Sequence, residues 1–407
     1  MKKWIIIICS FIFAMVLGIT MYFVFFNKEE RPQKVDETLK PINELSITLK
    51  ENMETTFMSK VKVSDFIDNV NYELVDDFEI ETNSIGEKKV EFSLKDVNGY
   101  TEKYNFTINV RDTEAPTIWV SSSYSVSQYS SIDLAKSIMC IDDYDENPTC
   151  VVEGYYNTNV IGTYPLVYKA TDSSGNTKEE SFNLIVTNGS SSPYYGEPIM
   201  FSDVLSKYKN DDTMIGLDIS AWQGEIDFDK IKNAGVEFVI LRVGSEDNYG
   251  RFVDKWFNTY YDEAKRVGLK IGAYYYSYAE NIEYAKEDAK FVLEALKGKE
   301  LDLPVAFDFE EWSMINKFHF SKYSLTMMAK AFLDEIKKGG YEGMNYSSKA
   351  YLEKIWMDTT YPTWLAHYID QTNYTGEYSI WQFSSMVSID GVGGRVDCNV
   401  AYKNKMN

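Results

Sequence analysis

The stretch Leu303-Pro-Val-Ala-Phe-Asp-Phe-Glu310 is the most informative part of the chain for the fold. Read as a β-strand, it directs Phe307 and Phe309 to one side, because successive side chains of a strand alternate. Asp308 and Glu310 then share the other side. An ordinary strand turns its charges toward water and its apolar side inward. Two acids that end an apolar run are instead typical of a barrel strand whose bulky side chains face an outer layer of helices.

A second segment, Ile215-Gly-Leu-Asp-Ile-Ser220, repeats this arrangement, with Asp218 on the side of the small residues. Barrel enzymes place their chemistry at the C-terminal ends of such strands, and clustered carboxyl groups carry out glycoside hydrolysis. The same alternation places Gln382 on one side of 378–383 with Ile380, and Asp397 on one side of 395–399 with Arg395 and Asn399. It predicts that one pocket collects Asp218, Asp308, Glu310, Gln382 and Asp397.

Strand-like segments alternate with helix-like segments from residue 213 to residue 407, which predicts a parallel α/β domain. Strands are expected at 214–219, 238–244, 270–277, 304–310, 343–347, 363–368, 378–384 and 395–399. Helices are expected at about 228–234, 254–267, 281–297 and 321–339. The later strands have short connections, so the barrel should be irregular on its C-terminal side.

Residues 43–188 contain an internal repeat with an offset of 76 residues, which aligns Asp96 with Asp172 and Gly99 with Gly175. Both copies consist of short alternating segments and end in an Asp-x-x-Gly turn followed by a last strand. This pattern predicts two small all-β sandwiches.

The predicted sandwiches occupy residues 43–113 and 114–188, and a Gly, Ser and Pro-rich linker follows at 189–212. A short helix is expected within that linker at 202–209. The stretch Ala170-Thr-Asp-Ser-Ser-Gly-Asn176 resembles the immunoglobulin-like modules of bacterial surface proteins. That resemblance extends to both copies and implies a spacer or adhesive role.

Residues 4–26 carry no charged side chain and follow Lys2 and Lys3. As a helix the run would reach roughly 34 Å, which is enough to span a bilayer. We expect an uncleaved single-pass anchor with its N-terminus in the cytoplasm, a stalk at 27–42, and the remaining domains outside the cell. Cleavage as a signal peptide stays open, although the run is long and lacks an Ala-x-Ala site.

The net charge of −21 argues against nucleic acid as a partner, because phosphate would be repelled. Outside the cell, Cys140 and Cys150 could form a disulfide, but two free thiols remain the alternative. The chain contains only two histidines, His319 and His367, so a zinc site is not expected.

Motifs in the C-terminal half resemble, in order, those of glycoside hydrolase family 25, the lysozymes of the muramidase type. The opening motif is Gly216-Leu-Asp-Ile-Ser-Ala-Trp-Gln-Gly224, and the carboxylate motif is Pro304-Val-Ala-Phe-Asp-Phe-Glu310. The others are Phe238-Val-Ile-Leu-Arg-Val-Gly244, Ile271-Gly-Ala-Tyr-Tyr-Tyr276, Trp364-Leu-Ala-His-Tyr368, Ile380-Trp-Gln-Phe383 and Val396-Asp-Cys-Asn399. The chain departs from the pattern at Ser245-Glu-Asp-Asn-Tyr-Gly250, where many members carry an acidic-glycine motif.

This resemblance implies a flattened, atypical (β/α) barrel without metal or cofactor. It implies cleavage of the β-1,4 bond between N-acetylmuramic acid and N-acetylglucosamine in peptidoglycan. By position, Glu310 corresponds to the acid/base, and Asp308 and Asp218 correspond to the other essential carboxylates. Direct attack by a carboxylate and attack by the substrate's acetamido group both stay open. Expected substrate contacts are Asp397, Gln382, Trp364, Tyr274, Tyr276 and Tyr346.

The expected fold is therefore multidomain: a transmembrane helix, two immunoglobulin-like sandwiches and a C-terminal irregular (β/α) barrel. The expected function is a membrane-anchored peptidoglycan hydrolase whose partners are glycan strands. Three alternatives stay open: a non-hydrolytic wall-binding scaffold, a hydrolase of another N-acetylated glycan such as chitin, and adhesion by the sandwiches. At the level of residues, Asp218 could cap a helix, Asp397 could belong to a turn, and the Asp308 and Glu310 pair could be a solvated strand end.

Overall fold

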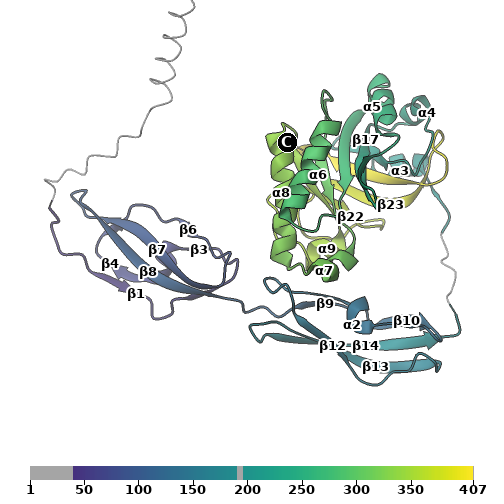
Figure 1. Ribbon diagram of the computed structural model, residues 1–407. Coiled ribbons are helices and arrows are strands. Elements are labelled where there is room, and N and C mark those ends of the chain that lie inside the picture. Colours follow the sequence, from purple (N-terminus) through teal and green to yellow (C-terminus); the bar gives the residue numbers. More distant parts are fainter. Residues whose placement is uncertain (1–39, 190–195, 407) are drawn as a thin grey trace, which may run out of the picture. The chain divides into compact units, whose positions relative to one another are not determined.

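The computed structural model describes residues 40–189 and 196–406 (Figure 1). The predicted membrane anchor at 4–26 lies outside the described residues, as does the stalk up to residue 39. Every helix within the described ranges is too short or too polar to cross a bilayer. The chain divides into two compact units, one ending at Asp112 and the other beginning at Thr113.

The first unit is built on a four-stranded sheet with the order β2-β8-β7-β5. Its centre is the hairpin of β7 (Gly86–Lys95) and β8 (Thr101–Arg111), which pair antiparallel along their whole length. Two smaller pairings, β1 with β4 and β3 with β6, cover one side of the core. The short strands are β1 (Ile47–Leu49), β2 (Glu54–Thr56), β3 (Val61–Lys62), β4 (Ile67–Val70), β5 (Glu73–Leu74) and β6 (Glu79–Ile80).

The second unit begins with another β-module, whose four-stranded sheet has the order β10-β14-β13-β12. A two-stranded pairing of β9 with β11 and the short helix α2 complete it. The elements are β9 (Thr117–Trp119), β10 (Ser123–Ser127), α2 (Leu134–Ser137), β11 (Met139–Ile141), β12 (Thr149–Glu153), β13 (Gly162–Thr171) and β14 (Thr177–Thr187).

The central hairpins of the two modules occupy equivalent positions in the repeat. Strands β13 and β14 begin and end 76 residues after β7 and β8, so the predicted offset is confirmed. In the second module a disulfide joins Cys140 to Cys150, which the spacing alone left open. The immunoglobulin-like assignment of both modules stays a prediction.

The remainder of the second unit is a barrel whose strands follow the path β23-β22-β21-β20-β19-β17-β16-β24 and close through the pairing of β23 with β24, while β15 adds to the sheet by pairing with β23. Strand β24 runs antiparallel to both neighbours, which explains the irregular C-terminal side. The strands are β15 (Ile199–Met200), β16 (Thr213–Ile219), β17 (Phe238–Asp247), β18 (Gly250–Val253), β19 (Lys270–Tyr276), β20 (Val305–Asp308), β21 (Gly343–Ser348), β22 (Thr363–Ala366), β23 (Ile380–Ser388) and β24 (Val396–Tyr402).

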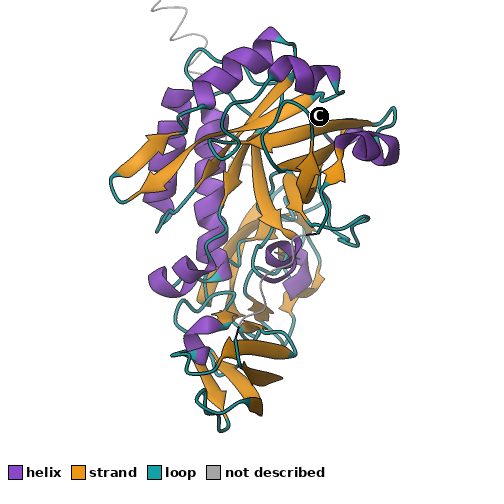
Figure 2. Cartoon of the chain, turned by 90° about the vertical axis from the view of Figure 1, so that its right-hand side faces the viewer, coloured by secondary structure: helices purple, strands orange, loops and turns teal. Residues whose placement is uncertain are grey.

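Helices cover the outside of this barrel (Figure 2). They are α3 (Phe201–Tyr208), α4 (Phe228–Asn233), α5 (Phe257–Arg266), α6 (Ile282–Ala295), α7 (Trp312–Phe318), α8 (Lys322–Lys338) and α9 (Lys349–Lys354). Every strand and helix expected for residues 202–399 has a counterpart. The short elements β15, β18, α7 and α9 were not expected, because each is too brief to show a periodic pattern.

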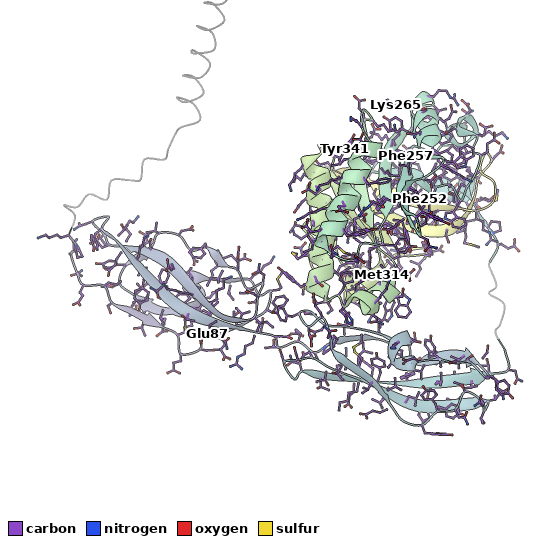
Figure 3. All side chains as sticks on the ribbon, viewed as in Figure 1. Glu87, Phe252, Phe257, Lys265, Met314 and Tyr341 are labelled. Atoms are coloured by element: carbon purple, nitrogen blue, oxygen red, sulfur yellow. A yellow bond between two sulfur atoms is a disulfide. The ribbon has the colours of Figure 1, made fainter. Side chains whose placement is uncertain are left out.

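The alternation of β20 is the one predicted from the sequence. Phe307 and Phe309 belong to the large apolar cluster between sheet and helices, where the Phe307 ring lies 5.1 Å from that of Phe332 on α8. Ala306 belongs to a separate cluster inside the barrel. Side chains fill the space between the helices and the sheet (Figure 3), among them the buried Phe257 of α5. The carboxylate of Asp308 therefore points into the barrel.

Candidate active site

One cleft collects every acid, amide and aromatic side chain that the sequence assigned to the site. Its lining residues are Asp218, Ser220, Trp222, Gln223, Arg242, Tyr274, Tyr276, Asp308, Glu310, Tyr346, Trp364, Tyr368, Gln382 and Asp397. They come from β16, β17, β19, β20, β21, β22, β23, β24 and adjoining loops. Segments almost two hundred residues apart in the chain thus meet at a single place.

Asp218 is buried near the end of β16 and held by two amide groups. Its Oδ2 accepts hydrogen bonds from Asn399 Nδ2 (2.7 Å) and Gln382 Nε2 (3.0 Å). Burial raises the pKa of Asp218 to about 6, while the two amide donors oppose this shift. The alternative role as a helix cap is wrong, because Asp227 caps the helix that follows.

Two phenols fix the orientation of the Gln382 amide. The hydroxyls of Tyr346 and Tyr368 donate to Gln382 Oε1 at 2.9 and 3.0 Å. With its oxygen occupied in this way, the amide turns its nitrogen toward Asp218. The indole of Trp364 orients the Asn399 amide in the same way, since its Nε1 donates to Asn399 Oδ1 at 2.8 Å.

Asp308 is the last residue of β20 and exposes 3% of its surface. Its Oδ1 is buried and has no hydrogen-bond partner among the described residues. Burial raises the pKa of Asp308 well above its usual range, and the nearby charge of Glu310 raises it further. The surroundings therefore favour the protonated form of Asp308, with Glu310 as its neighbour.

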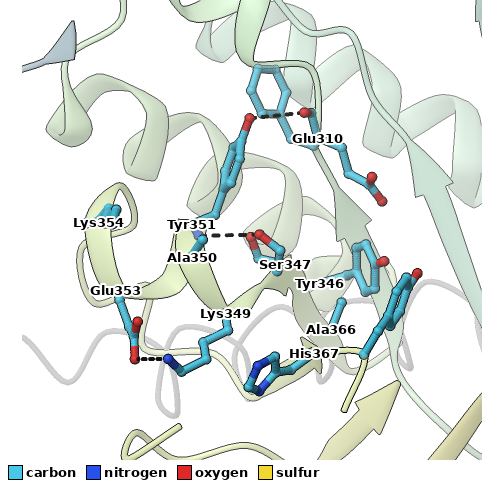
Figure 4. Close-up of a pocket in the computed structure, with 13 residues that line it drawn as sticks. Glu310, Tyr346, Ser347, Lys349, Ala350, Tyr351, Glu353, Lys354, Ala366 and His367 are labelled. Atoms are coloured by element: carbon cyan, nitrogen blue, oxygen red, sulfur yellow. Dashed lines mark hydrogen bonds and ion pairs between the residues drawn. The ribbon is translucent and has the colours of Figure 1, made fainter. Parts of the chain in front are cut away.

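Glu310 lies just beyond the strand and is exposed at the mouth of the cleft. Its backbone carbonyl accepts a hydrogen bond from the Tyr351 hydroxyl at 3.0 Å (Figure 4). Burial raises the pKa of Glu310, while the hydrogen bond from Asp308 opposes the shift. The alternative that Asp308 and Glu310 form an ordinary solvated strand end is therefore wrong, because Asp308 is buried.

Asp397 lies on β24 directly opposite Asp218 in the antiparallel pairing with β16. Burial raises its pKa to about 8, and the charges of Asp218 and Glu310 add to the shift. The alternative role as a turn residue is wrong, because Asp397 is within the strand. Four carboxyl groups thus share the cleft, and burial raises the pKa of each of them.

The aromatic residues of the cleft divide into buried and exposed ones. Trp364 exposes 1% of its surface and packs against the rings of Tyr346 (4.6 Å) and Tyr274 (6.1 Å). Its ring face is not free to stack on a sugar, so the predicted role of Trp364 in stacking is corrected to one of support. By contrast, Trp222 exposes 85% and Tyr368 exposes 56%.

Sequence reasoning did not assign five residues that line the cleft: Ser220, Trp222, Gln223, Arg242 and Tyr368. All five belong to the quoted motifs, so their positions were visible in the sequence but their place in the cleft was not. Arg242 belongs to β17, and its Nε and Nη2 atoms pair with Asp254 at 2.8 and 2.7 Å. Its charge opposes the rise in the pKa of Asp308.

A second cavity shares part of its lining with the cleft (Figure 4). Its lining residues are Phe309, Glu310, Tyr346, Ser347, Ser348, Lys349, Ala350, Tyr351, Glu353, Lys354, Ala366, His367 and Tyr368. Glu310, Tyr346 and Tyr368 line both cavities. Glu310 therefore lies at the boundary between the two cavities.

Comparison with known proteins gives one family for this part of the chain. Residues 217–392 match the model of glycosyl hydrolases family 25. The autolytic lysozyme of Clostridium acetobutylicum is 28% identical over 187 residues, covering 45% of this chain and 54% of that protein. Lysozyme M1 of Streptomyces globisporus is 25% identical over 202 residues, covering 45% of this chain and 66% of that protein.

Among solved structures, the modular autolysin LytC from Streptococcus pneumoniae, in complex with a synthetic peptidoglycan ligand, is 26% identical. That match covers 58% of this chain and 56% of LytC, with a TM-score of 0.43. The chain thus spans only about half the length of the autolytic lysozyme and of LytC. The match of residues 217–392, which include most of the cleft, identifies this part of the chain as a glycoside hydrolase family 25 domain.

Proposed function

We propose that this chain hydrolyses peptidoglycan, cleaving the β-1,4 bond between N-acetylmuramic acid and N-acetylglucosamine. The observation that carries the proposal is the meeting of Asp308 and Glu310 with Asp218 and Asp397 in one cleft. Glycoside hydrolysis needs one carboxyl group that keeps a proton and one that is ionised. The names of the two lysozyme relatives support the same substrate.

Glu310 is the proposed general acid and base. It is the carboxyl group that both cavities share, so a bond lying across the boundary between them would meet its side chain. A raised pKa lets a carboxyl group deliver a proton to the leaving oxygen near neutral pH. After bond cleavage, the ionised Glu310 would take a proton from the attacking water.

Asp308 is the proposed proton partner of Glu310. It is too buried to reach a sugar from its present position, and its hydrogen bond to Glu310 keeps a proton within reach of the acid. Its effect would therefore be on the protonation of Glu310.

Asp218 is the proposed anion of the site. With a pKa of about 6 it is mostly ionised at neutral pH, and the amides of Gln382 and Asn399 stabilise that charge. Such an anion stabilises the positive charge that develops on the sugar ring, either by direct attack or by orienting the substrate's acetamido group. Both routes fit the arrangement.

The test is the release of reducing sugar from purified peptidoglycan. Glu310→Gln is expected to lower the rate about 100-fold or more, the usual effect of losing a general acid. Glu294→Gln is the matched control, since it removes an exposed acid of α6 that pairs with Lys297 and does not line the cleft, and it should leave the rate within about twofold. Equal rates for Glu310→Gln and the unaltered chain would refute the role of Glu310.

The same experiment separates the alternatives. A wall-binding scaffold would bind peptidoglycan without releasing sugar. A hydrolase of chitin would release products from chitin oligomers faster than from peptidoglycan. Turnover of peptidoglycan alone is the result that the proposal expects.

We further propose that the chain is anchored by residues 4–26 and acts on the outer side of the cell membrane. The disulfide between Cys140 and Cys150 supports an oxidising compartment. Protease added to intact cells from which the wall has been removed should then degrade residues 43–407. Full protection of these residues until the cells are lysed would contradict the proposal.

A further inference from the structure

The loop after β11 contains a carboxylate that is fully buried and only half satisfied. Asp142 exposes 0% of its surface. Its Oδ1 accepts hydrogen bonds from the backbone N–H groups of Tyr144 (2.9 Å) and Asp145 (2.7 Å). Its Oδ2 is buried and has no hydrogen-bond partner within the described ranges. A buried carboxylate oxygen without a partner is costly, and it calls for an explanation.

A second buried acid stands beside it. Asp172 lies in the turn between β13 and β14, where Asn176 donates to both of its carboxylate oxygens at 2.8 Å. A carboxylate oxygen of Asp142 and one of Asp172 lie within 4.8 Å of each other. Burial raises the pKa of Asp142, and the charge of Asp172 raises it further.

No basic side chain relieves this pair in the part of the chain that the structure describes. Lys322 Nζ approaches the same loop, but it pairs with Asp143 at 2.6 Å. Burial and the charges of Asp172 and Asp143 raise the pKa of Asp142, and the groups that oppose this rise are the backbone N–H groups of Asp145 and Tyr144. The site thus has the negative charge of two carboxylates and lacks a positive partner.

The first module provides an internal comparison. Asp96 is the equivalent of Asp172 in the repeat and is also buried. Its oxygens accept hydrogen bonds from the backbone N–H groups of Ile42 (3.1 Å), Asn98 (2.9 Å) and Tyr100 (2.8 Å). Burial raises the pKa of Asp96, but these donors outweigh it and the net shift is downward. This turn is therefore satisfied by the backbone, whereas the turn of the second module faces another acid.

We propose that Asp142 and Asp172 bind a divalent cation of the calcium type. Hard carboxylate oxygens are the ligands of Ca²⁺ and Mg²⁺, and the larger Ca²⁺ accepts six to eight oxygens in flexible geometry. Backbone carbonyls and water would complete its coordination. The disulfide between Cys140 and Cys150 closes the segment that carries Asp142, so this ligand is held in place before the cation binds. The inference does not depend on the proposed hydrolase activity.

The cation would strengthen the junction between the second module and the barrel. The backbone carbonyl of Asp142 accepts a hydrogen bond from Lys322 N (2.8 Å), and that of Asp143 accepts one from Tyr323 N (3.1 Å). Both donors lie in the first turn of α8. Fixing the loop at Asp142 would therefore also fix its contacts with the barrel.

The purified full chain is first treated with a chelator to remove bound metal. Calcium binding is then measured by isothermal titration calorimetry with CaCl₂. We expect one Ca²⁺ per chain with a dissociation constant of about 10⁻⁴ to 10⁻³ M, the range of extracellular modules. MgCl₂ should bind at least about tenfold more weakly, because Mg²⁺ gives up its water reluctantly. Absence of calcium binding at 10 mM, or equal affinity for both ions, would overturn the proposal.

Variants make the assignment specific. Asp142→Asn and Asp172→Asn should each weaken calcium binding at least about tenfold. Glu153→Gln is the matched control, because it removes an exposed acid from the same module and should bind calcium like the unaltered chain. Undiminished binding by both aspartate variants, or loss of binding by Glu153→Gln, would overturn the site.

The temperature of thermal unfolding is a second measurement, and it shows whether a variant that fails to bind calcium is still folded. Without calcium, Asp142→Asn should unfold no earlier than the unaltered chain, because the amide removes the repulsion from Asp172. Adding 10 mM calcium should raise the unfolding temperature of the unaltered chain by a few degrees and leave that of the variant unchanged. If Asp142→Asn fails to fold, Asp172→Asn decides the proposal by the same two measurements. A calcium-dependent rise in both variants would contradict it.

Discussion

The most revealing perturbation of the cleft is the loss of one amide from Asp218. Asn399 Nδ2 donates to Asp218 Oδ2 at 2.7 Å, and Gln382 Nε2 donates to the same oxygen at 3.0 Å. Asn399→Ala removes the shorter of these two hydrogen bonds. Because the lost donor stabilised the ionised form, the pKa of Asp218 must rise above its value of about 6.

The size of the rise follows from the strength of the bond. A hydrogen bond to a charged group contributes about 1.5–3 kcal/mol, and one pKa unit corresponds to about 1.4 kcal/mol. The pKa of Asp218 should therefore move from about 6 to roughly 7–8. If Asp218 acts in its ionised form, the acidic limb of the activity profile moves upward by one to two pH units, and the activity is lost first at low pH.

The assay is the pH dependence of kcat/KM for peptidoglycan cleavage, which reports the ionisations of the free enzyme. Asn399→Ala also removes the acceptor of the Trp364 indole N–H, so a control is needed. Trp364→Phe breaks that contact but keeps the Asn399 donor, and its acidic limb should stay within about half a unit of the unaltered one. The reasoning would be refuted if the acidic limb of the pH profile did not move in Asn399→Ala. It would also be refuted if the limb moved as far in Trp364→Phe as in Asn399→Ala.

Three further predictions concern binding and stability. Trp222→Ala, which removes an exposed ring at the cleft, should raise KM about tenfold with little change in kcat, and a large fall in kcat alone would contradict a binding role. Cys140→Ser should lower the stability of the second module by about 2–4 kcal/mol in denaturant unfolding, and no change would argue against the disulfide as a constraint. Phe332→Ala, at the buried contact with Phe307, should cost about 3–5 kcal/mol, whereas a loss below about 1 kcal/mol would contradict tight packing of α8 on β20.

Much of the barrel was predictable because strand alternation depends only on local sequence. Phe307 faces the helices and Asp308 faces the cleft as the alternation requires. The same alternation assigned Gln382 and Asp397, which lie on later strands, to the cleft, and both line it. The offset of the repeat likewise follows from spacing alone.

Other features of the site depend on contacts that a local pattern does not contain. Trp364 was expected to stack on sugar, but its neighbours Tyr346 and Tyr274 bury it. The exposure of Trp222 and Tyr368 is set by loops and strand ends, whose conformation alternation does not describe. For the same reason the short helices α7 and α9, which adjoin Glu310 and the second cavity, could not be expected.

The buried acids of the second module show a further limit. The sequence aligned Asp172 with Asp96, yet the two turns differ in what faces them. The alignment of the repeat does not show that Ile42 supplies a backbone donor to Asp96 in one module. Nor does it show that the carboxylate of Asp142 lies near Asp172 in the other. Charge balance in a buried site is a property of tertiary structure.

The central claim is that Glu310, Asp308 and Asp218 cleave the glycan strand of peptidoglycan after N-acetylmuramic acid. Mass spectrometry of the products, after reduction of the new chain ends, tests it most directly. The account predicts ends that carry reduced N-acetylmuramic acid, and their absence from digests with Glu310→Gln. Ends that carry reduced N-acetylglucosamine, or the same products from Glu310→Gln, would contradict it.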